Sequence, residues 1–492
     1  MAMSVTAFAA GGAAGTCTLT VNAKGGQDLK GQTINLYKLF DVTESTSGET
    51  KNYAYTVNTA YKTALVNVLT KLKTVSAIPD VTETSTDAEL AAAVSSIGAK
   101  DSETVQKFAN DFTTYALTQN SKLDATTNSG KLGEVASYEF TGLDAGYYLV
   151  YVTGGKEIQS SLVTVDETTT TVNLKTEAPS IEKKADKETV SIGQVVKYTV
   201  TGSIPDTTGY EQYVYKIHDT LTTGLDFVND ATGTALREGA TTVNIKVAFG
   251  EGVTDAGTAP ATATLSGEGN RQMVLDLSEW VRTNQANNKG KEFTVTYYAK
   301  VNKAAVVTEK NSAHLEYGNN PGETTTTTPS EAKTPTYPLD ILKIKKDTEE
   351  ILAGAHFTLY ASTTAGVIDE SKPIKVTKVA DGKYSYAADQ TSTDPSVITD
   401  MVTVASKIEG QGYNLHINGL AAGTYYLKET KAPDGYNKLT EAIKVTITKS
   451  TTTDENEWTL TVDKGTVDGK IVKVENSTGS LLPSTGGRGA IA

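Results

Sequence analysis

Lysine, carboxylate and asparagine side chains share strand faces with apolar residues in the middle of the sequence. Period-two spacing places Lys183, Asp219 and Asn311 each in such an alternating run. Their apolar partners are, in order, Ile181 and Ala185, Tyr215 and Ile217, and Ala313, Leu315 and Tyr317. Burial would lower the pKa of a lysine, which favours the nucleophilic neutral amine, and would raise the pKa of a carboxylic acid, which favours its neutral form. A neutral acid can polarise an amide and move protons as ammonia leaves. The alternative is that Asp219 is buried and satisfied by backbone groups while Lys183 lies at the surface.

Other reactive residue types are isolated. The four histidines, at positions 218, 314, 356 and 416, have no partner at metal-ligand spacing, so we expect no metal and no cofactor. No nucleophile elbow or phosphate-binding loop is present. Cys17 is the single cysteine and cannot form an internal disulfide, so covalent reinforcement must come from other chemistry.

Length and charge narrow the functional classes. The 492 residues are enough for about three domains. A net charge of −13 argues against nucleic-acid binding, because binding to phosphates requires clustered Lys and Arg. Residues 1–10 look like the end of a secretory signal, an apolar stretch that closes on small residues. We therefore expect a secreted protein.

The sequence contains one domain type twice. Residues 29–37 match residues 352–360 without a gap in their Leu, Gly, apolar, Leu, Tyr skeleton, and residues 142–148 match residues 419–425 in the same way. Two matched segments in the same order indicate a repeated module. Alternating apolar and polar residues with frequent turns predict a β-sandwich.

Both copies resemble the CnaB-type immunoglobulin-like sandwich of Gram-positive adhesins and pilins. The predicted fold class is therefore mainly β, with tandem sandwiches, the first carrying a helical insertion over roughly 58–121. Helical spacing there is shown by Ala60, Ala64, Leu65, Val68, Leu69 and Leu72, and by Val105, Phe108, Phe112 and Ala116. A third, short helix is predicted from Asp87. We expect this insertion to pack on the sandwich rather than to hold a cofactor.

Five segments follow from these patterns. They are a residual signal or N-terminal segment (1–15), a first CnaB-like domain (16–175), a middle immunoglobulin-like domain (176–333), a third CnaB domain (334–481) and a C-terminal signal (482–492). The middle domain is predicted from alternation over 195–200 and 214–219. A Thr-rich stretch before residue 330 is predicted to be a linker or exposed edge.

The C-terminal segment Leu482-Pro483-Ser484-Thr485-Gly486 resembles the LPxTG sorting signal of Gram-positive surface proteins. The resemblance implies that a sortase thiolate attacks the Thr485 carbonyl and expels Gly486, with this chain as the substrate. A Pro-Ser turn that ends a domain is the alternative. The family continues with an apolar span and a basic tail, whereas only residues 488–492 remain here, so we expect a truncated chain.

The third domain resembles CnaB modules that form an intramolecular isopeptide bond. In the strand 341–347, the match to a lysine two places before Asp347 makes Lys345 the amine donor. The segment 423–436 resembles the family's E-box and makes Glu429 the catalytic acid, while Asn476 matches the acceptor amide. Solvated charges on wet faces are the alternative for Lys345 and Glu429.

The middle domain resembles the pilin domain whose acid is an aspartate, which implies Lys183 as donor, favoured over Lys184, Asp219 as acid and Asn311 as acceptor. The alternative to a reactive trio is a buried Asp219 that is hydrogen-bonded by backbone groups, with the lysine at the surface.

The first domain departs from this pattern. Ungapped alignment puts Asn22 opposite Lys345 and Val152 opposite Glu429. Both reactive groups are replaced, so no bond is expected in this domain, although Asn173 stands near its end.

Lys175 lies between the first two domains, where backbone pilins carry a linking lysine, although the usual Tyr-Pro before it is missing. The resemblance implies a major pilin in which Thr485 of one subunit is joined to Lys175 of the next by a class C sortase. A housekeeping sortase, identical subunits head to tail, tip and base minor pilins and host surface ligands are the implied partners, and the implied location is the cell wall of a Gram-positive bacterium. The alternatives are a solvated linker lysine and a monomeric wall-anchored adhesin.

Overall fold

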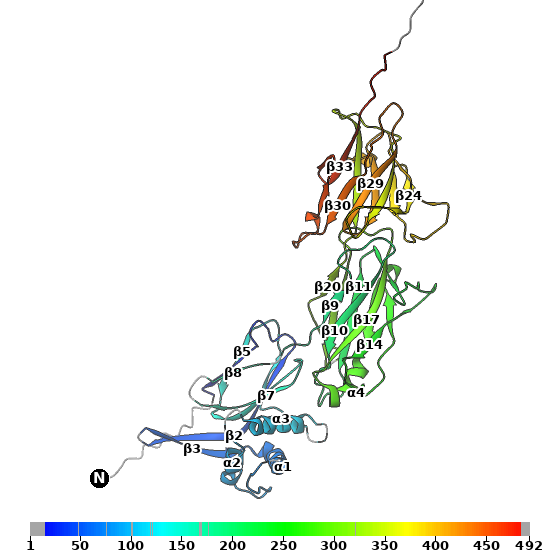
Figure 1. Cartoon of the computed structure of the whole chain (residues 1–492). Coiled ribbons are helices and arrows are strands. Elements are labelled where there is room, and N and C mark those ends of the chain that lie inside the picture. The colour runs from blue at the N-terminus through cyan, green and yellow to red at the C-terminus, as the bar shows by residue number, and fades with distance from the viewer. Residues whose placement is uncertain are drawn as a thin grey trace, which may run out of the picture.

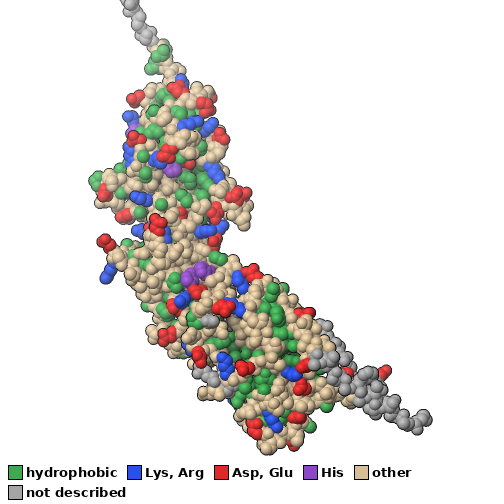
Figure 2. Space-filling view, turned by 180° about the vertical axis from the view of Figure 1, so that it is seen from behind, with side chains coloured by type: hydrophobic (Ala, Val, Ile, Leu, Met, Phe, Trp, Pro, Cys, Tyr) green, Lys and Arg blue, Asp and Glu red, His purple; other side chains and the backbone are tan. Residues whose placement is uncertain are grey.

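Three β-rich bodies follow one another along an elongated molecule (Figure 1). The computed structural model describes residues 15–483 apart from 48, 75, 100–101, 119, 121, 167–169, 176 and 320. Charged side chains of both signs are interspersed over the face seen in Figure 2. In the described part of the chain, no helix is both long and apolar enough to span a bilayer.

The first domain contains two sheets and a helical insertion. One sheet has the order β5-β1-β8, and the other has the order β3-β2-β6-β7 with β4 beside β2. The strands are β1 (Cys17–Asn22), β2 (Thr33–Ser47), β3 (Thr50–Val57), β4 (Thr127–Lys131), β5 (Ser137–Leu143), β6 (Gly146–Thr153), β7 (Gln159–Val165) and β8 (Thr170–Asn173). The helices are η1 (Thr59–Tyr61), α1 (Lys62–Leu72), α2 (Asp87–Ser95) and α3 (Glu103–Leu117).

The predicted helical insertion is confirmed. Helix α1 buries Ala64, Leu65, Val68, Leu69 and Leu72, and α3 buries Phe108, Ala109, Phe112, Thr113, Ala116 and Leu117. These side chains form one core with Tyr37, Leu149 and Tyr151 of the larger sheet. Helix α2 begins with a capping box between Thr86 and Glu89, which satisfies backbone donors of its first turn. The insertion thus covers one face of the sheet.

The middle domain is a sandwich with one short helix. Its sheets have the orders β12-β17-β10-β9, with β14 on β17, and β13-β15-β16-β11-β18-β19, with β20 on β18. The strands are β9 (Glu182–Ala185), β10 (Val195–Ser203), β11 (Val214–Leu221), β12 (Leu225–Val228), β13 (Thr242–Asn244), β14 (Lys246–Phe249), β15 (Thr262–Ser266), β16 (Gln272–Asp276), β17 (Glu292–Val301), β18 (Lys310–Gly318), β19 (Thr325–Thr326) and β20 (Ser330–Lys333). The helices are η2 (Glu268–Asn270) and α4 (Ser278–Asn288).

The third domain is again a two-sheet sandwich. Its sheets have the orders β26-β24-β25-β28-β21-β33-β32 and β23-β22-β29-β30-β31, with β27 on β22. The strands are β21 (Tyr337–Lys345), β22 (His356–Ser362), β23 (Ile368–Pro373), β24 (Val376–Ala380), β25 (Lys383–Tyr386), β26 (Val397–Ile398), β27 (Met401–Val402), β28 (Leu415–Leu420), β29 (Gly423–Lys431), β30 (Ile443–Thr448), β31 (Thr459–Val462), β32 (Thr466–Asp468) and β33 (Ile471–Asn476). The short helices are η3 (Ile408–Gly410) and η4 (Glu455–Glu457).

The repeat predicted from the sequence has a structural counterpart. In both outer domains the first strand pairs in parallel with the last, β1 with β8 and β21 with β33. Each copy also has a tyrosine at the same place, and its hydroxyl donates to a carbonyl four residues upstream. The bonds are Tyr148 to Asp144 at 2.8 Å and Tyr425 to Ala421 at 2.7 Å. The two segments therefore form the same local structure.

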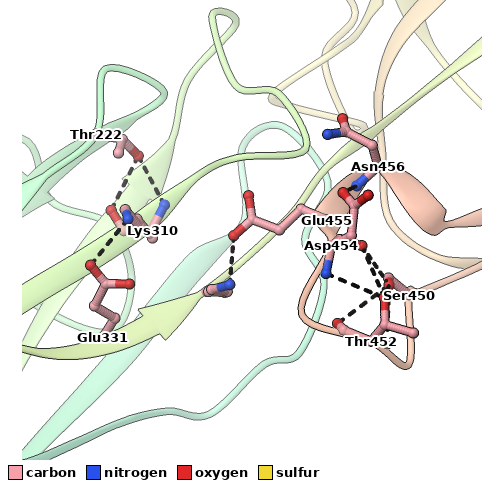
Figure 3. Close-up of polar contacts among 9 residues, drawn as sticks. Thr222, Lys310, Glu331, Ser450, Thr452, Asp454, Glu455 and Asn456 are labelled. Atoms are coloured by element: carbon pink, nitrogen blue, oxygen red, sulfur yellow. Dashed lines mark hydrogen bonds and ion pairs between the residues drawn. The ribbon is translucent and has the colours of Figure 1, made fainter.

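The middle and third domains share a polar junction. Ile192 N donates to Gly419 O at 3.0 Å, and Ala422 N donates to the Thr189 hydroxyl at 3.1 Å. Glu455 of η4 forms an ion pair with Lys333 of β20 at 2.8 Å (Figure 3). Backbone and side-chain contacts thus both join these two sandwiches.

Candidate functional site

Three strands of the third domain aim polar groups into its core. Strand β21 presents Tyr337, Leu339, Ile341 and Lys343 to the interior by period-two alternation. Glu429 lies on β29 and Asn476 is the last residue of β33. Lys343, Glu429 and Asn476 are 0, 2 and 1% exposed, which is rare for such side chains unless they are paired.

The three buried groups meet. Lys343 Nζ lies 3.9 Å from Glu429 Oε1, and the Asn476 amide nitrogen donates to Glu429 Oε2 at 3.0 Å. Glu429 Oε2 also accepts from Leu439 N at 2.7 Å, while the Asn476 nitrogen donates to Asn437 O at 2.8 Å. The carboxyl group therefore lies between the amine and the amide.

Burial makes this cluster electrostatically unusual. Desolvation lowers the pKa of Lys343 to about 8, against the opposing attraction of Glu429 and Glu475. Within the described part of the chain, Glu429 Oε1 and Asn476 Oδ1 have no hydrogen-bond partner. Unsatisfied buried polar atoms are costly, so a functional explanation is needed.

The structure corrects the choice of Lys345 as the amine donor. The Lys345 side chain is 38% exposed and lies 3.6 Å from Glu350 at the surface. Strand β21 ends at Lys345, where the chain turns through Asp347 at a φ of 59°. Lys343 is one inward-facing position earlier and is therefore enclosed. The alternation from Leu339 through Ile341 could have indicated it.

A second buried cluster lies in the middle domain. Lys183 on β9, Asp219 on β11 and Asn311 on β18 are 4, 1 and 0% exposed. Strand β9 belongs to one sheet, and β11 and β18 pair in the other, so the cluster spans the sandwich. By contrast, the side chain of Lys184 is 71% exposed and pairs with Glu182. The structure thus places Lys183, rather than Lys184, in the core.

In the middle cluster, the amine and the acid contact each other and share a tyrosine hydroxyl. Lys183 Nζ lies 2.5 Å from Asp219 Oδ2, and both atoms hydrogen-bond the Tyr297 hydroxyl. Burial lowers the pKa of Lys183 to about 8, although Asp219 opposes that shift. Among the described residues, neither polar atom of the Asn311 amide finds a hydrogen-bond partner.

Sequence reasoning missed two tyrosines of this cluster. The rings of Tyr198 and Tyr297 lie with their centroids 4.6 Å from Lys183 Nζ, within cation–π range. Both tyrosines occupy inward positions of strands β10 and β17. Alternation could have placed them in the core, but it carries no information on which core residues surround an amine.

The first domain has apolar residues at the corresponding positions. In the parallel terminal pair, Val21 faces Val172 as Lys343 faces Val474, and the next inward residue is Leu174. Val152 pairs with Ile34 as Glu429 pairs with Phe357. The register thus puts Val21, Val152 and Leu174 where the third domain has Lys343, Glu429 and Asn476.

The two asparagines considered in the sequence analysis, Asn22 and Asn173, lie elsewhere. Asn22 and Asn173 hydrogen-bond each other at 2.9 Å, in an exposed setting. The ungapped alignment, which put Asn22 opposite Lys345 and hence Thr20 opposite Lys343, is therefore one residue out of register with the buried positions.

Lys175 is exposed at the junction between the first two domains. Its backbone nitrogen donates to the Gln159 side chain at 2.6 Å, and the preceding Leu174 is buried. At the other end of the chain, Leu482 is 87% exposed. Of the predicted sorting signal, Ser484, Thr485 and Gly486 lie outside the described residues.

Metal-ligating side chains do not cluster in the described part of the chain. Within the described ranges, no group of three or more His, Cys, Asp or Glu residues has the geometry to hold a metal ion. The nearest histidine pair, His218 and His314, is stacked with ring centroids 4.8 Å apart, and His218 contacts Glu316 at 2.6 Å.

These groups can support an amide exchange within one domain. A neutral lysine amine is a nucleophile, and a carboxyl group in contact with both amine and amide can carry protons between them. Attack of Nζ on the asparagine Cγ would form a new amide and release ammonia. The geometry fits this reaction best in the third domain, where Glu429 reaches both partners.

Comparison with known proteins relates one part of the chain to a known domain family. Residues 338–462 match the SpaA domain family, a prealbumin-like fold. No curated protein matches the sequence significantly.

Several solved structures are similar in fold. The T6 backbone pilin of Streptococcus pyogenes is 17% identical with a TM-score of 0.43, covering 94% of this chain and 98% of that one. The major pilin SpaA of Corynebacterium diphtheriae is 16% identical with a TM-score of 0.45, covering 94% of this chain and 100% of that one. The pilus 2b backbone protein of group B streptococcus is 24% identical with a TM-score of 0.38, covering 61% of this chain and 98% of that one.

Proposed function

We propose that this chain is the backbone subunit of a sortase-assembled Gram-positive pilus, reinforced by intramolecular isopeptide bonds. The observation that carries the proposal is the pair of buried amine–acid–amide clusters, Lys343 with Glu429 and Asn476, and Lys183 with Asp219 and Asn311. The match of residues 338–462 to the SpaA domain family supports it independently.

The cross-linking reaction is a single turnover on the chain itself. In the third domain, Glu429 takes a proton from Lys343 through Oε1, and the neutral amine attacks Cγ of Asn476. Oε2 already contacts the amide nitrogen, so the same carboxyl group can protonate it as ammonia leaves. The second Nζ proton then passes to Glu429, which ends protonated. The chain is otherwise a structural protein and a sortase substrate rather than an enzyme with external substrates.

Polymerisation would use two exposed sites. Lys175 lies on the surface between the first two domains, and the chain leaves the third domain through exposed residues that lead to Thr485. A class C sortase would join Thr485 of one subunit to Lys175 of the next, and a housekeeping sortase would attach the fibre to the cell wall. Tip and base minor pilins, and host ligands, would complete the assembly.

The intact mass of the purified chain tests the cross-links. Two ammonia losses are expected, and tandem mass spectrometry of a digest should map them to Lys183–Asn311 and Lys343–Asn476. An unmodified mass would contradict the proposal.

Substitution of the junction lysine tests the polymer. Lys175→Ala should abolish the high-mass ladder that a class C sortase produces. Lys24→Ala is the matched control, because Lys24 is exposed at the same junction, where it pairs with Glu177 at 2.6 Å. A ladder that survives Lys175→Ala would favour a different linking lysine, and a single band in the unsubstituted chain would favour the monomeric adhesin.

A further inference from the structure

The middle and third clusters differ in how their acid reaches the amide. In the third domain, Glu429 bonds the Asn476 amide nitrogen directly at 3.0 Å. In the middle domain the acid is an aspartate, which is one methylene shorter. Among the described residues, neither Asp219 Oδ1 nor the Asn311 amide has a hydrogen-bond partner. A direct bond from acid to amide is thus present in one cluster only.

Tyr297 borders the amine and the acid of the middle cluster. It is fully buried on β17, and its hydroxyl contacts both Lys183 Nζ and Asp219 Oδ2. The Asn311 side chain lies close enough to this hydroxyl to lower the pKa of Tyr297 against the larger effect of burial, although the two groups do not form a hydrogen bond. It is therefore adjacent to the amine, the acid and the amide.

The hydroxyl is suited to carry a proton. Burial, followed by the charge of Asp219, raises the pKa of Tyr297 well above its usual value, so the phenol stays neutral. A neutral phenol accepts from the Lys183 ammonium and donates to the Asp219 carboxylate at the same time. It can give its proton to a new acceptor only while it receives another.

We infer that Tyr297 is a catalytic residue of the middle-domain cross-linking reaction, relaying a proton from Asp219 to the amide nitrogen of Asn311. This inference rests on the proposed isopeptide chemistry. Its structural basis is the contact of one buried hydroxyl with both Lys183 and Asp219, beside an amide that the shorter acid does not bond.

The proton balance closes within the cluster. Asp219 takes the first proton from the Lys183 ammonium, and the free amine attacks Cγ of Asn311. Tyr297 then gives its hydroxyl proton to the amide nitrogen and recovers one from Asp219, so that the bond from Cγ to this nitrogen breaks and ammonia leaves. The second proton from Nζ passes to Asp219, which ends protonated.

Tyr198 provides a matched control within the same core. Its ring centroid lies at the same 4.6 Å from Lys183 Nζ as that of Tyr297, and both side chains are fully buried. Within the described residues, however, the Tyr198 hydroxyl makes no hydrogen bond. Removing either hydroxyl leaves a phenylalanine ring in place, so the two substitutions separate proton transfer from packing.

The experiment follows cross-linking after cell-free synthesis by time-resolved intact mass and peptide mapping. The unsubstituted chain should lose two ammonia molecules. Tyr297→Phe should form the third-domain bond normally but the Lys183–Asn311 bond on the order of 10²-fold more slowly, the usual contribution of a proton-transfer group. Tyr198→Phe should form both bonds normally. Cross-linking of Tyr297→Phe at the unsubstituted rate, or equal slowing by Tyr198→Phe, would overturn the inference.

A longer acid should replace the relay. In the Tyr297→Phe background, Asp219→Glu should restore bond formation, because the added methylene lets the carboxyl group reach the amide directly, as Glu429 does. A folded double variant, verified by amide NMR dispersion, that stays as slow as Tyr297→Phe would overturn the relay. If the unsubstituted chain itself lacks the Lys183–Asn311 bond, the proposed function fails in this domain, which is a different result.

Discussion

The first and third domains place different side chains on the same scaffold. Both pair their first and last strands in parallel, and both have the same tyrosine-to-carbonyl bond. At three corresponding core positions the first domain is apolar and the third is polar, with Val21, Val152 and Leu174 in one and Lys343, Glu429 and Asn476 in the other. The sandwich therefore does not need the polar set to fold. Because buried ion pairs often stabilise less than apolar residues of similar volume, the polar set is better explained by chemistry.

The largest expected effect comes from removing the third-domain amine. Lys343→Met should abolish one ammonia loss and lower the free energy of unfolding of this domain by about 4–5 kcal/mol, if the bond limits the unfolded chain as a disulfide closing a loop of this size would. Intact mass and thermal unfolding measure both effects. Lys345→Met is the control and should keep the ammonia loss, since Lys345 lies at the surface. A Lys343→Met chain that still loses both ammonia molecules would restore Lys345 as donor.

Burying a single charged residue in the first domain should lower its free energy of unfolding by nearly as much. Val152→Glu would bury a carboxyl group that has no amine beside it, at an expected cost of about 3–5 kcal/mol to that domain. Chemical denaturation monitored by near-UV circular dichroism can measure this. Thr141→Glu, at an exposed position of β5, should change stability by less than about 0.5 kcal/mol. If Val152→Glu changes the free energy of unfolding as little as Thr141→Glu does, the first domain does not need an apolar residue at this position.

An uncross-linked third domain should show a pH dependence that the apolar set Val21, Val152 and Leu174 of the first domain cannot produce. In Asn476→Ala, Lys343 keeps its amine, whose pKa is lowered by burial from its usual value to about 8. Between pH 8 and 10.5 the unfolded chain then binds more protons than the folded one, so stability rises with pH, by up to about 3 kcal/mol.

Urea unfolding at a series of pH values measures this rise. Adding Lys343→Met to Asn476→Ala should flatten the curve in that window. A curve that stays steep in the double variant would assign the effect to another group.

The smallest effect is expected at the outer asparagine pair of the first domain. Asn173→Ala removes a bond to Asn22 that lies in an exposed setting, so the free energy of unfolding should fall by about 0.5–1 kcal/mol, with no change in the number of ammonia losses. One ammonia loss fewer than in the unsubstituted chain would instead make Asn173 an acceptor and remove the contrast between the two outer domains.

Much of this arrangement follows from alternation and repetition in the sequence. Spacing predicted the sandwich class, the helical insertion and the inward position of Lys183. Alignment of the two repeats predicted that Val152 replaces the acid of the third domain. Lys345 was chosen wrongly because spacing does not show where β21 ends, and the last residue of a strand lies at the rim of the core. Tyr297 was missed because its contacts join β17 to β9 and β11, and those distances depend on how two sheets pack rather than on any local pattern.

The parallel pairing of β21 with β33 also has a mechanical consequence. A fibre under tension would pull the start of β21 and the end of β33 in opposite directions along the strands, so that their hydrogen bonds are loaded together in shear rather than opened one at a time. A covalent link between Lys343 and Asn476 would then carry the load past all the residues between them. These residues, which would span roughly 450 Å if the chain were fully stretched, would stay folded under load. The third domain would thus resist stretching almost as an inextensible segment.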